Sequence, residues 1–256
     1  MISYVDKTCL LQLRGFLAEQ KDIYSCRTAC LIKSYGLNYD FLSFYIQRDN
    51  SGAVTAAVGK YYSDMTVSLT KKSDFDELSE FISFSGASSI LCAKPLPMRS
   101  STETGMIMEL KHAVSGKLLP QSMNFCTSPD LRAVWKLLKS CEGSGFAVPE
   151  YEDFLLDMSH KLRHDTAHCI AVMWGEKTVS AAMTVAESDN CAVIGAVASD
   201  KGLRRSGLGS ACMTALCSEL KDKKIFIMRE LNANESFYKG LGFENTEKFY
   251  LHKKER

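Results

Sequence analysis

The sequence predicts an α/β protein built from two similar halves, each a mixed sheet flanked by helices. The predicted order of strands and helices in residues 1–118 recurs in residues 125–256. The segments VTAAVGKYYSDM at 54–65 and VSAAMTVAESDN at 179–190 also align without a gap, with five identities in twelve positions. Two alternating strands can match by chance, but the shared element order on both sides favours an ancient duplication.

The composition is that of an ordinary globular protein. Of the 256 residues, 46% are hydrophobic and 24% are charged, which excludes a disordered or fibrous chain. Thirty-one basic and thirty acidic residues give a net charge of +1. The chain therefore has no overall field that would attract nucleic acid or an anionic membrane, and we expect neither as a partner.

Cysteine usage and the start of the chain indicate the compartment. The ten cysteines are scattered and include no CxxC pair, which is typical of reduced, buried thiols rather than of a disulfide framework. Asp6, Lys7 and Arg14 interrupt the apolar core that a secretory signal needs. No uncharged apolar stretch reaches the length of a bilayer span. The sequence predicts a cytoplasmic protein.

In the first half, hydrophobic periodicity predicts a helical region over 8–33 that is broken near Gly36. A second helix is expected after Ser73, the predicted N-cap, because acidic residues follow in its first turn. The strands predicted around these helices span 41–46, 53–58, 65–69, 88–92 and 106–114. Residues 115–127 contain glycine, proline and small polar side chains, and they are predicted to form a linker.

The second half repeats this order of elements. Two helices are predicted over 129–140 and 149–164, and a later helix ends near Lys221. A short helix precedes the last strand. The predicted strands span 169–174, 178–186, 191–199, 225–228 and a final segment ending at Leu251.

The segment VIGAVASDKGLRRSGLGS, residues 193–210, combines a strand, a glycine-rich loop and the start of an amphipathic helix. The first backbone amides of a helix have no partner within the helix, and glycines let an anion approach the main chain. The helix dipole adds only about 0.3–1 kcal/mol, so amide hydrogen bonds and Arg204 or Arg205 must supply most of the affinity. Neither the GxGxxG pattern nor a complete P-loop pattern occurs in the chain. We expect an anion-binding loop of another kind.

Two motifs resemble those of a known family, the GCN5-related N-acetyltransferases (GNAT). The residues that match the family's acetyl-CoA signature, [QR]-x-x-G-x-[GA], are Arg204, Gly207 and Gly209. The residues that match its N-x-x-x-Y-x-x-x-G-F pattern are Asn234, Tyr238, Gly242 and Phe243. The resemblance covers residues 125–256 and implies that this half is an acetyltransferase domain with the acyl-CoA N-acyltransferase fold.

The resemblance also implies how acetyl-CoA binds. The strand ending at Ser199 would splay from the next strand and expose main-chain groups to the pantetheine arm, while the loop amides would hold the pyrophosphate. Asn234 would face the cofactor from the other side. The implied cofactor-binding residues are Val197, Ala198, Ser199, Arg204, Arg205, Ser206, Gly207, Leu208, Gly209, Ser210 and Asn234.

By this resemblance the chain is an N-acetyltransferase that moves an acetyl group from acetyl-CoA to a primary amine of an unidentified small molecule or peptide. Two alternatives are open: an acyltransferase that uses a longer acyl-CoA, and a CoA-binding regulator or scaffold without turnover. The resemblance assigns Tyr238 as the general acid for the departing thiolate, and a phenol with a pKa of about 10 is protonated at neutral pH. Glu230 and Glu187 both end strands and are alternative general bases acting through water.

Three histidines, His160, His164 and His168, recur every four residues and would form a metal-binding face on an unbroken helix. The helix is predicted to stop near Arg163. We therefore expect solvated histidines and predict no metal site.

The first half lacks both family motifs. At the offset of 125 residues, SEFISFS at 79–85 takes the place of the glycine-rich loop, and no Y-x-x-x-G-F pattern follows. The expectation is a degenerate GNAT-like domain over 1–118, which has a structural role and does not bind acetyl-CoA in the usual way.

Overall fold

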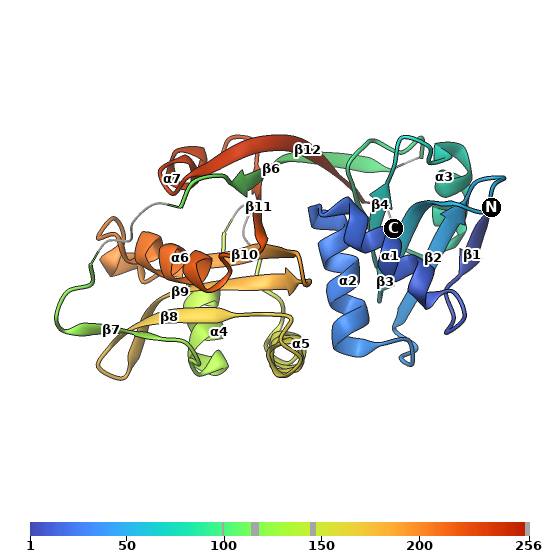
Figure 1. Ribbon diagram of the computed structural model, residues 1–256. Helices are drawn as coiled ribbons and strands as arrows, with labels where there is room; N and C mark the ends of the chain where they lie inside the picture. Colours follow the sequence, from blue (N-terminus) through green and yellow to red (C-terminus); the bar gives the residue numbers. More distant parts are fainter. Residues whose placement is uncertain (99, 114–117, 144–146, 254–256) are drawn as a thin grey trace. The chain divides into compact units, whose positions relative to one another are not determined.

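The predicted α/β fold is confirmed, with mixed sheets and flanking helices (Figure 1). The computed structural model describes residues 1–98, 100–113, 118–143 and 147–253. The chain divides into two compact units. Unit 1 comprises residues 1–107 and 246–256, and unit 2 comprises residues 108–245.

Unit 1 is a mixed sheet with helices on both faces. Its strand order is β1-β2-β3-β4-β5-β12. Strands β4 and β5 are parallel and joined by α3, whereas β1 to β4 are antiparallel and β12 is antiparallel to β5. The apolar residues of α1 and α2 pack on one face, and those of α3 pack on the other. The elements are β1 (Ile2–Tyr4), α1 (Leu10–Gln20), α2 (Ile23–Tyr35), β2 (Leu42–Arg48), β3 (Val54–Tyr61), β4 (Asp64–Leu69), α3 (Phe75–Phe84), β5 (Ser89–Cys92), the first part of β6 (Ser101–Leu110) and most of β12 (Phe243–Lys253).

The predicted helical region 8–33 is two helices instead of one. The chain turns at Lys21, which has a left-handed backbone with φ of 48°. Asp22 then caps α2, because its carboxylate accepts a hydrogen bond of 2.7 Å from the backbone N–H of Ser25. The hydroxyl of Ser25 in turn accepts from the N–H of Asp22 at 3.1 Å. This capping box starts a new helix where apolar periodicity alone continues across the break.

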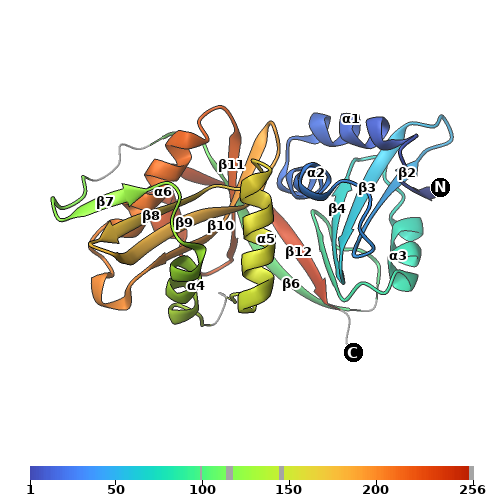
Figure 2. The same cartoon turned by 90° about the horizontal axis from the view of Figure 1, so that it is seen from below.

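Unit 2 has the same kind of layers (Figure 2). Its strand order is β6-β11-β10-β9-β8-β7. Strands β10 and β11 are parallel and joined by α6, whereas β7 to β10 are antiparallel. The elements are the end of β6, β7 (Met123–Cys126), α4 (Leu131–Ser140), α5 (Tyr151–Arg163), β8 (Cys169–Trp174), β9 (Lys177–Glu187), β10 (Cys191–Ser199), a 3₁₀ turn (Lys201–Leu203), α6 (Leu208–Glu219), β11 (Lys224–Glu230), α7 (Glu235–Lys239) and the start of β12.

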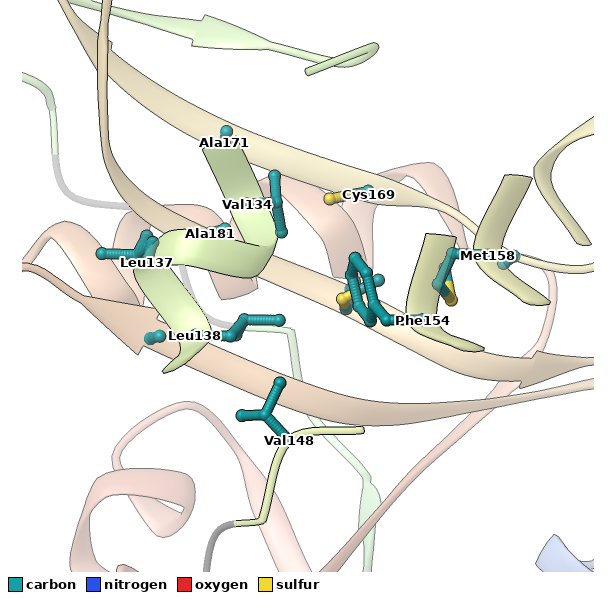
Figure 3. Packing of buried hydrophobic residues seen from close by; sticks show 12 residues of the cluster. Val134, Leu137, Leu138, Val148, Phe154, Met158, Cys169, Ala171 and Ala181 are labelled. Carbon is teal, nitrogen blue, oxygen red and sulfur yellow. The ribbon is translucent and has the colours of Figure 1, made fainter. Parts of the chain in front are cut away.

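The core beneath α4 and α5 holds the sheet that carries the candidate site. Figure 3 shows Leu138 of α4 and Phe154 of α5 packed with Ala171 and Ala181 of the strands. The small alanine side chains allow the helices to lie close to the sheet. Burying a side chain of leucine or phenylalanine size contributes about 1.5–3 kcal/mol, so this layer holds β8 to β10 firmly.

Part of the predicted linker is a strand. Met123–Cys126 forms β7, which pairs antiparallel with β8 from Met123↔Trp174 to Cys126↔Ala171. The apolar side chains at alternating positions suit a sheet edge, a pattern that the small polar neighbours obscure in the sequence. Residues 115–117 of the predicted linker lie outside the described residues. Strand β6 begins earlier than predicted, at Ser101 instead of 106.

Each unit contains a strand segment from the other half of the sequence. The chain from Thr246 onward belongs to unit 1, where Tyr250 is paired with Cys92 in β5. The end of β6, from Met108, belongs to unit 2. The predicted domain ranges are continuous in the sequence, whereas the compact units are not, because strand pairing rather than chain order decides membership.

Each unit contains a parallel crossover connection of its own. Strands β4 and β5 are connected by α3 in unit 1, and β10 and β11 are connected by α6 in unit 2. Because α3 begins at Phe75 and α6 at Leu208, the offset at this point is 133 and no longer 125. The expectation that 79–85 replaces the glycine-rich loop is therefore wrong. Those residues lie in and just after α3, and the loop's counterpart is 70–74.

Candidate active site

A cavity of about 960 Å³ in unit 2 is lined by the ends of β10 and β11 and the starts of α6 and α7. Tyr238, Glu230 and all of the implied cofactor-binding residues except Ser206 line it, whereas the alternative base Glu187 does not. The Ser206 hydroxyl instead donates a hydrogen bond of 2.5 Å to the carbonyl of Leu203 and stabilises the loop. The predicted residues that line the cavity are Val197, Ala198, Ser199, Arg204, Arg205, Gly207, Leu208, Gly209, Ser210, Glu230, Asn234 and Tyr238.

The edge of β10 opens at Gly195. Parallel pairing with β11 runs from Cys191↔Lys224 to Ile194↔Ile227 and, within the described part of the chain, does not continue to Ser199. The register against β9 is irregular at Gly195, and a Cβ built there would lie 2.2 Å from Cγ1 of Val185. Only glycine fits this bulge. The main chain beyond it faces the cavity.

The loop after β10 presents backbone amides to the same cavity. Arg205 and Gly207 have left-handed backbones, with φ of 64° and 91°. Gly207 precedes α6, and no side chain in the described residues caps this helix. The first hydrogen bond of α6 runs from the N–H of Ala211 to the carbonyl of Gly207. The amides of Leu208, Gly209 and Ser210 therefore have no acceptor within the helix.

The corresponding helix of unit 1 is closed to an anion. Asp74, not the predicted Ser73, caps α3, and its carboxylate accepts hydrogen bonds from the N–H groups of Asp76 and Glu77 at 3.1 and 3.0 Å. Those two residues also place carboxylates in the first turn. The Ser73 hydroxyl donates to the carbonyl of Thr55. Where α6 offers free amides, α3 offers negative charge.

Helix α7 also lines the cavity. Asn234 precedes it in a left-handed conformation with φ of 58°, and among the described residues no side-chain hydrogen bond of Asn234 caps the helix. Tyr238 lies one turn later, and its ring meets those of Phe237 and Phe243 edge to face, with centroids 5.1 and 6.0 Å away. Burial raises the pKa of the Tyr238 hydroxyl above its ordinary value, so it is protonated at neutral pH.

Residues 131–243 match the sequence model of the acetyltransferase (GNAT) family. This part of the chain is a GNAT-family domain. The predicted resemblance is thereby confirmed. Family membership supports acyl-CoA-dependent acyl transfer as the activity class.

Solved structures extend the likeness to the whole chain. A tandem GNAT protein from the clavulanic acid biosynthesis pathway matches with a TM-score of 0.63 and 12% identity, over 99% of this chain and 98% of that one. A Drosophila protein matches with a TM-score of 0.66 and 10% identity, over 98% of each chain. A GCN5-related N-acetyltransferase from Sphaerobacter thermophilus matches with a TM-score of 0.58 and 12% identity, over 99% of this chain and 95% of that one. Identities this low show the fold alone. No curated protein sequence matches the chain.

The two carboxylates considered as general base differ in environment in the GNAT domain. Glu230 is exposed at the end of β11 and lines the cavity. Glu187 is fully buried elsewhere, where it accepts hydrogen bonds of 2.7 Å from His168, Thr184 and Lys223. Burial opposes its ionisation, but these three donors hold the pKa of Glu187 below its ordinary value. Glu187 is a structural ion and does not line the cavity.

The histidine series of the GNAT domain is broken as expected, because α5 ends at Arg163. His160 and His164 remain neighbours, with ring centroids 4.5 Å apart. His168, expected to be solvated, instead bonds Glu187 through Nδ1. Within the described ranges, no group of three His, Cys, Asp or Glu side chains could hold a metal, and no helix is long and apolar enough to cross a membrane.

Several cavity residues of the GNAT domain are not part of the sequence-based set. Cys141 follows α4, and its thiol donates to the carbonyl of Ser199 at 3.3 Å. Gly195 lies at the bulge, and a lone glycine within a predicted strand is a sequence signal for a bulge. Arg229 precedes Glu230 and has no motif that would reveal it. The residues missed are Cys141, Gly195, Leu203, Met228, Arg229, Ala233, Ser236 and Phe237.

Proposed function

We propose that the GNAT domain transfers an acetyl group from acetyl-CoA to a primary amine. One observation carries this proposal: the uncapped start of α6, the open edge of β10 and Tyr238 border the same cavity. The first suits a phosphate, the second an extended amide-containing arm, and the third a leaving group that needs a proton.

The residues present fit acetyl-CoA. A Cβ at Gly209 would lie 3.3 Å from the hydroxyl of Ser199 and would narrow the approach to the free amides. Arg204 and Arg205 add positive charge beside them. We assign the pyrophosphate to the amides of Arg205 through Ser210, the pantetheine arm to the main chain of Val197–Ser199, and the opposite wall to Asn234.

When bound, acetyl-CoA supplies an acyl group activated as a thioester. Tyr238 holds the proton that the departing sulfur takes up, because its phenol is neutral and the residue lines the cavity. Glu230 is the carboxylate placed to accept the proton of the attacking amine through a water molecule. Main-chain N–H groups of the open β10 edge can stabilise negative charge on the carbonyl oxygen.

Thiol release with a panel of primary amines tests the proposal. Turnover with acetyl-CoA and an amine supports it, whereas tight acetyl-CoA binding without turnover favours the CoA-binding regulator or scaffold. Faster turnover with a longer acyl-CoA favours the other acyltransferase. The panel includes both small amines and peptides.

The proposal also covers the compartment of the enzyme and the role of unit 1. None of the ten cysteines, all within the described residues, forms a disulfide, which suits a reducing compartment such as the cytoplasm. Unit 1 serves as a structural GNAT-like domain, because the start of α3 is occupied by the Asp74 carboxylate.

A further inference from the structure

Arg229 is a buried cation beside the cavity. It is the penultimate residue of β11, and its side chain is only 3% exposed. One terminal nitrogen, Nη1, donates to the carbonyls of Glu230 and Leu231 at 2.9 and 2.6 Å. These carbonyls belong to the turn that leads from β11 to α7. The guanidinium therefore holds the main chain of that turn directly.

The remaining donors of Arg229 hold the surroundings of α7. Nη2 lies 2.8 Å from the carboxylate of Glu235, the first residue of α7, and donates to the side-chain oxygen of Asn245 at 3.2 Å. The amide nitrogen of Asn245 closes the ring by donating to Glu235 at 3.0 Å. Nε lies 3.3 Å from the sulfur of Met108. Met108 and Asn245 are the first and last residues of unit 2.

Helix α7 needs such a tether. It spans only Glu235–Lys239, and helices this short are not stable by themselves. The residue before it, Asn234, has a left-handed backbone, a conformation that asparagine adopts more readily than other residues besides glycine. A second ion pair, Lys239 to Glu235 at 2.7 Å, is more exposed and does not reach the turn.

We propose that Arg229 is the positioning residue of the acyl-transfer site: its planar fork fixes the β11–α7 turn and thereby places Asn234 and Tyr238 on the cavity. The inference rests on the proposed function for its catalytic part. A lysine retains the charge but has a single nitrogen, so it cannot hold two turn carbonyls, Glu235 and Asn245 together. Arg229 acts through Tyr238 and is not itself assigned a contact with the acyl group.

A double-mutant cycle between Arg229→Lys and Tyr238→Phe tests the proposal. Each single variant is expected to lower kcat on the order of 10²-fold, because each removes or misplaces the same general acid. Since both substitutions act on one group, Arg229→Lys should lower kcat little further when it is added to Tyr238→Phe. Fully additive losses, or wild-type kcat in Arg229→Lys, would overturn the proposal.

A second readout does not depend on turnover. Ultraviolet titration of Tyr238, taken as the difference from Tyr238→Phe, should show a pKa that falls toward the ordinary tyrosine value in Arg229→Lys, because a loosened α7 exposes the ring. An unchanged titration contradicts the positioning role even if the wild-type protein proves inactive. If the titration shifts but no amine is acetylated, the positioning role stands and the proposed function fails.

Two further variants distinguish a positioning role from a general loss of stability. Lys239→Met removes an ion pair to the same Glu235 without touching the turn, and it should leave kcat and the Tyr238 titration unchanged. Arg229→Met combined with Glu235→Gln leaves no carboxylate facing the lost guanidinium, so it should fold. This double variant should reproduce the kcat loss and the Tyr238 shift of Arg229→Lys. If it is folded and behaves as wild type, the proposal is wrong.

Discussion

At the scale of single residues, the candidate site depends on where side chains are missing as much as on where they are present. Gly195 and Gly209 leave room at the two main-chain surfaces that border the cavity. Gly207 and Arg205 turn the loop through left-handed conformations that aim the amides outward. The Arg205 backbone is strained for a non-glycine residue, and such strain is frequent where the main chain binds a ligand.

The first prediction concerns Gly209→Val. Its side chain would press on the Ser199 hydroxyl and cover the amides of α6, so acetyl-CoA binding should weaken by about tenfold or more, equivalent to one charge-assisted hydrogen bond. Calorimetry measures the dissociation constant. Gly15→Val is the matched control, because a Cβ at Gly15 has nothing within 4 Å. Unchanged affinity in Gly209→Val would remove the binding assignment. Gly207→Val is a poorer test, since its positive φ strains any β-branched side chain.

The second prediction concerns Tyr238→Phe. The ring and its contacts with Phe237 and Phe243 persist, so acetyl-CoA affinity should hold while kcat falls about 10²–10⁴-fold, nearer the lower end because water can replace part of the function. Steady-state kinetics and calorimetry separate the two quantities. Weakened binding with normal kcat would make Tyr238 a residue that positions the cofactor, and no effect on either would leave it as part of the core.

At the scale of elements, α3 and α6 occupy the same place in two parallel crossovers and have opposite starts. Glycine and uncapped amides begin α6, whereas a carboxylate and two acidic residues begin α3. Because a helix start attracts anions only when its amides are free and no negative charge stands beside them, the Asp74 cap and the two acids that follow it separate the start of α3 from that of α6.

The third prediction follows from this contrast. Asp74→Ala removes the cap of α3 and should lower the free energy of unfolding by about 0.5–2 kcal/mol. Asp74→Asn keeps a capping oxygen and should retain most of the wild-type free energy of unfolding. Chemical denaturation measures both variants. Neither should change the stoichiometry of acetyl-CoA binding, because Asp76 and Glu77 still repel an anion. A second bound acetyl-CoA in Asp74→Ala would contradict the structural role of unit 1.

At the scale of the whole molecule, each unit carries a hydrogen-bonded histidine, buried in unit 1 and half-exposed in unit 2, and the two respond to pH in opposite directions. In unit 1, His252 is 1% exposed, accepts at Nε2 from the N–H of Leu96, and meets the hydroxyls of Ser100 and Thr102 at Nδ1. Burial lowers its pKa. In unit 2, the hydrogen bond to Glu187 raises the pKa of His168.

The fourth prediction gives the sign of each effect. Below about pH 6.5, His252 is protonated in the unfolded chain but stays neutral in the folded chain, so the free energy of unfolding falls as the pH decreases through this range. In His252→Gln the free energy of unfolding should depend less on pH there. His168 contributes stability that is complete below about pH 6.5 and is lost as pH rises through its folded pKa, so His168→Gln should matter most at low pH. Denaturation at several pH values between 5 and 8 measures both, and parallel curves for wild type and variants would contradict the assignment.

Although β1 and β7 do not follow from the sequence, most of the order of elements, the GNAT resemblance and the site residues Arg204, Gly207, Gly209, Asn234 and Tyr238 do. These follow from local rules, because a glycine loop, a helix start and a motif on a short helix need only neighbouring residues to be recognised. The helix break at Lys21 and Asp22 was in principle readable too, since it rests on a capping box.

The remaining features depend on long-range packing. Glu187 and Glu230 are both strand-end carboxylates in the sequence, but their surroundings separate a buried structural ion from a cavity residue. Arg229 holds groups close to it along the chain, such as the carbonyls of Glu230 and Leu231, but its contact with Met108 comes from a strand 121 residues away. The membership of β12 in unit 1 is likewise set by pairing with β5. Burial and long-range pairing depend on what the rest of the fold brings close, and no local pattern records them.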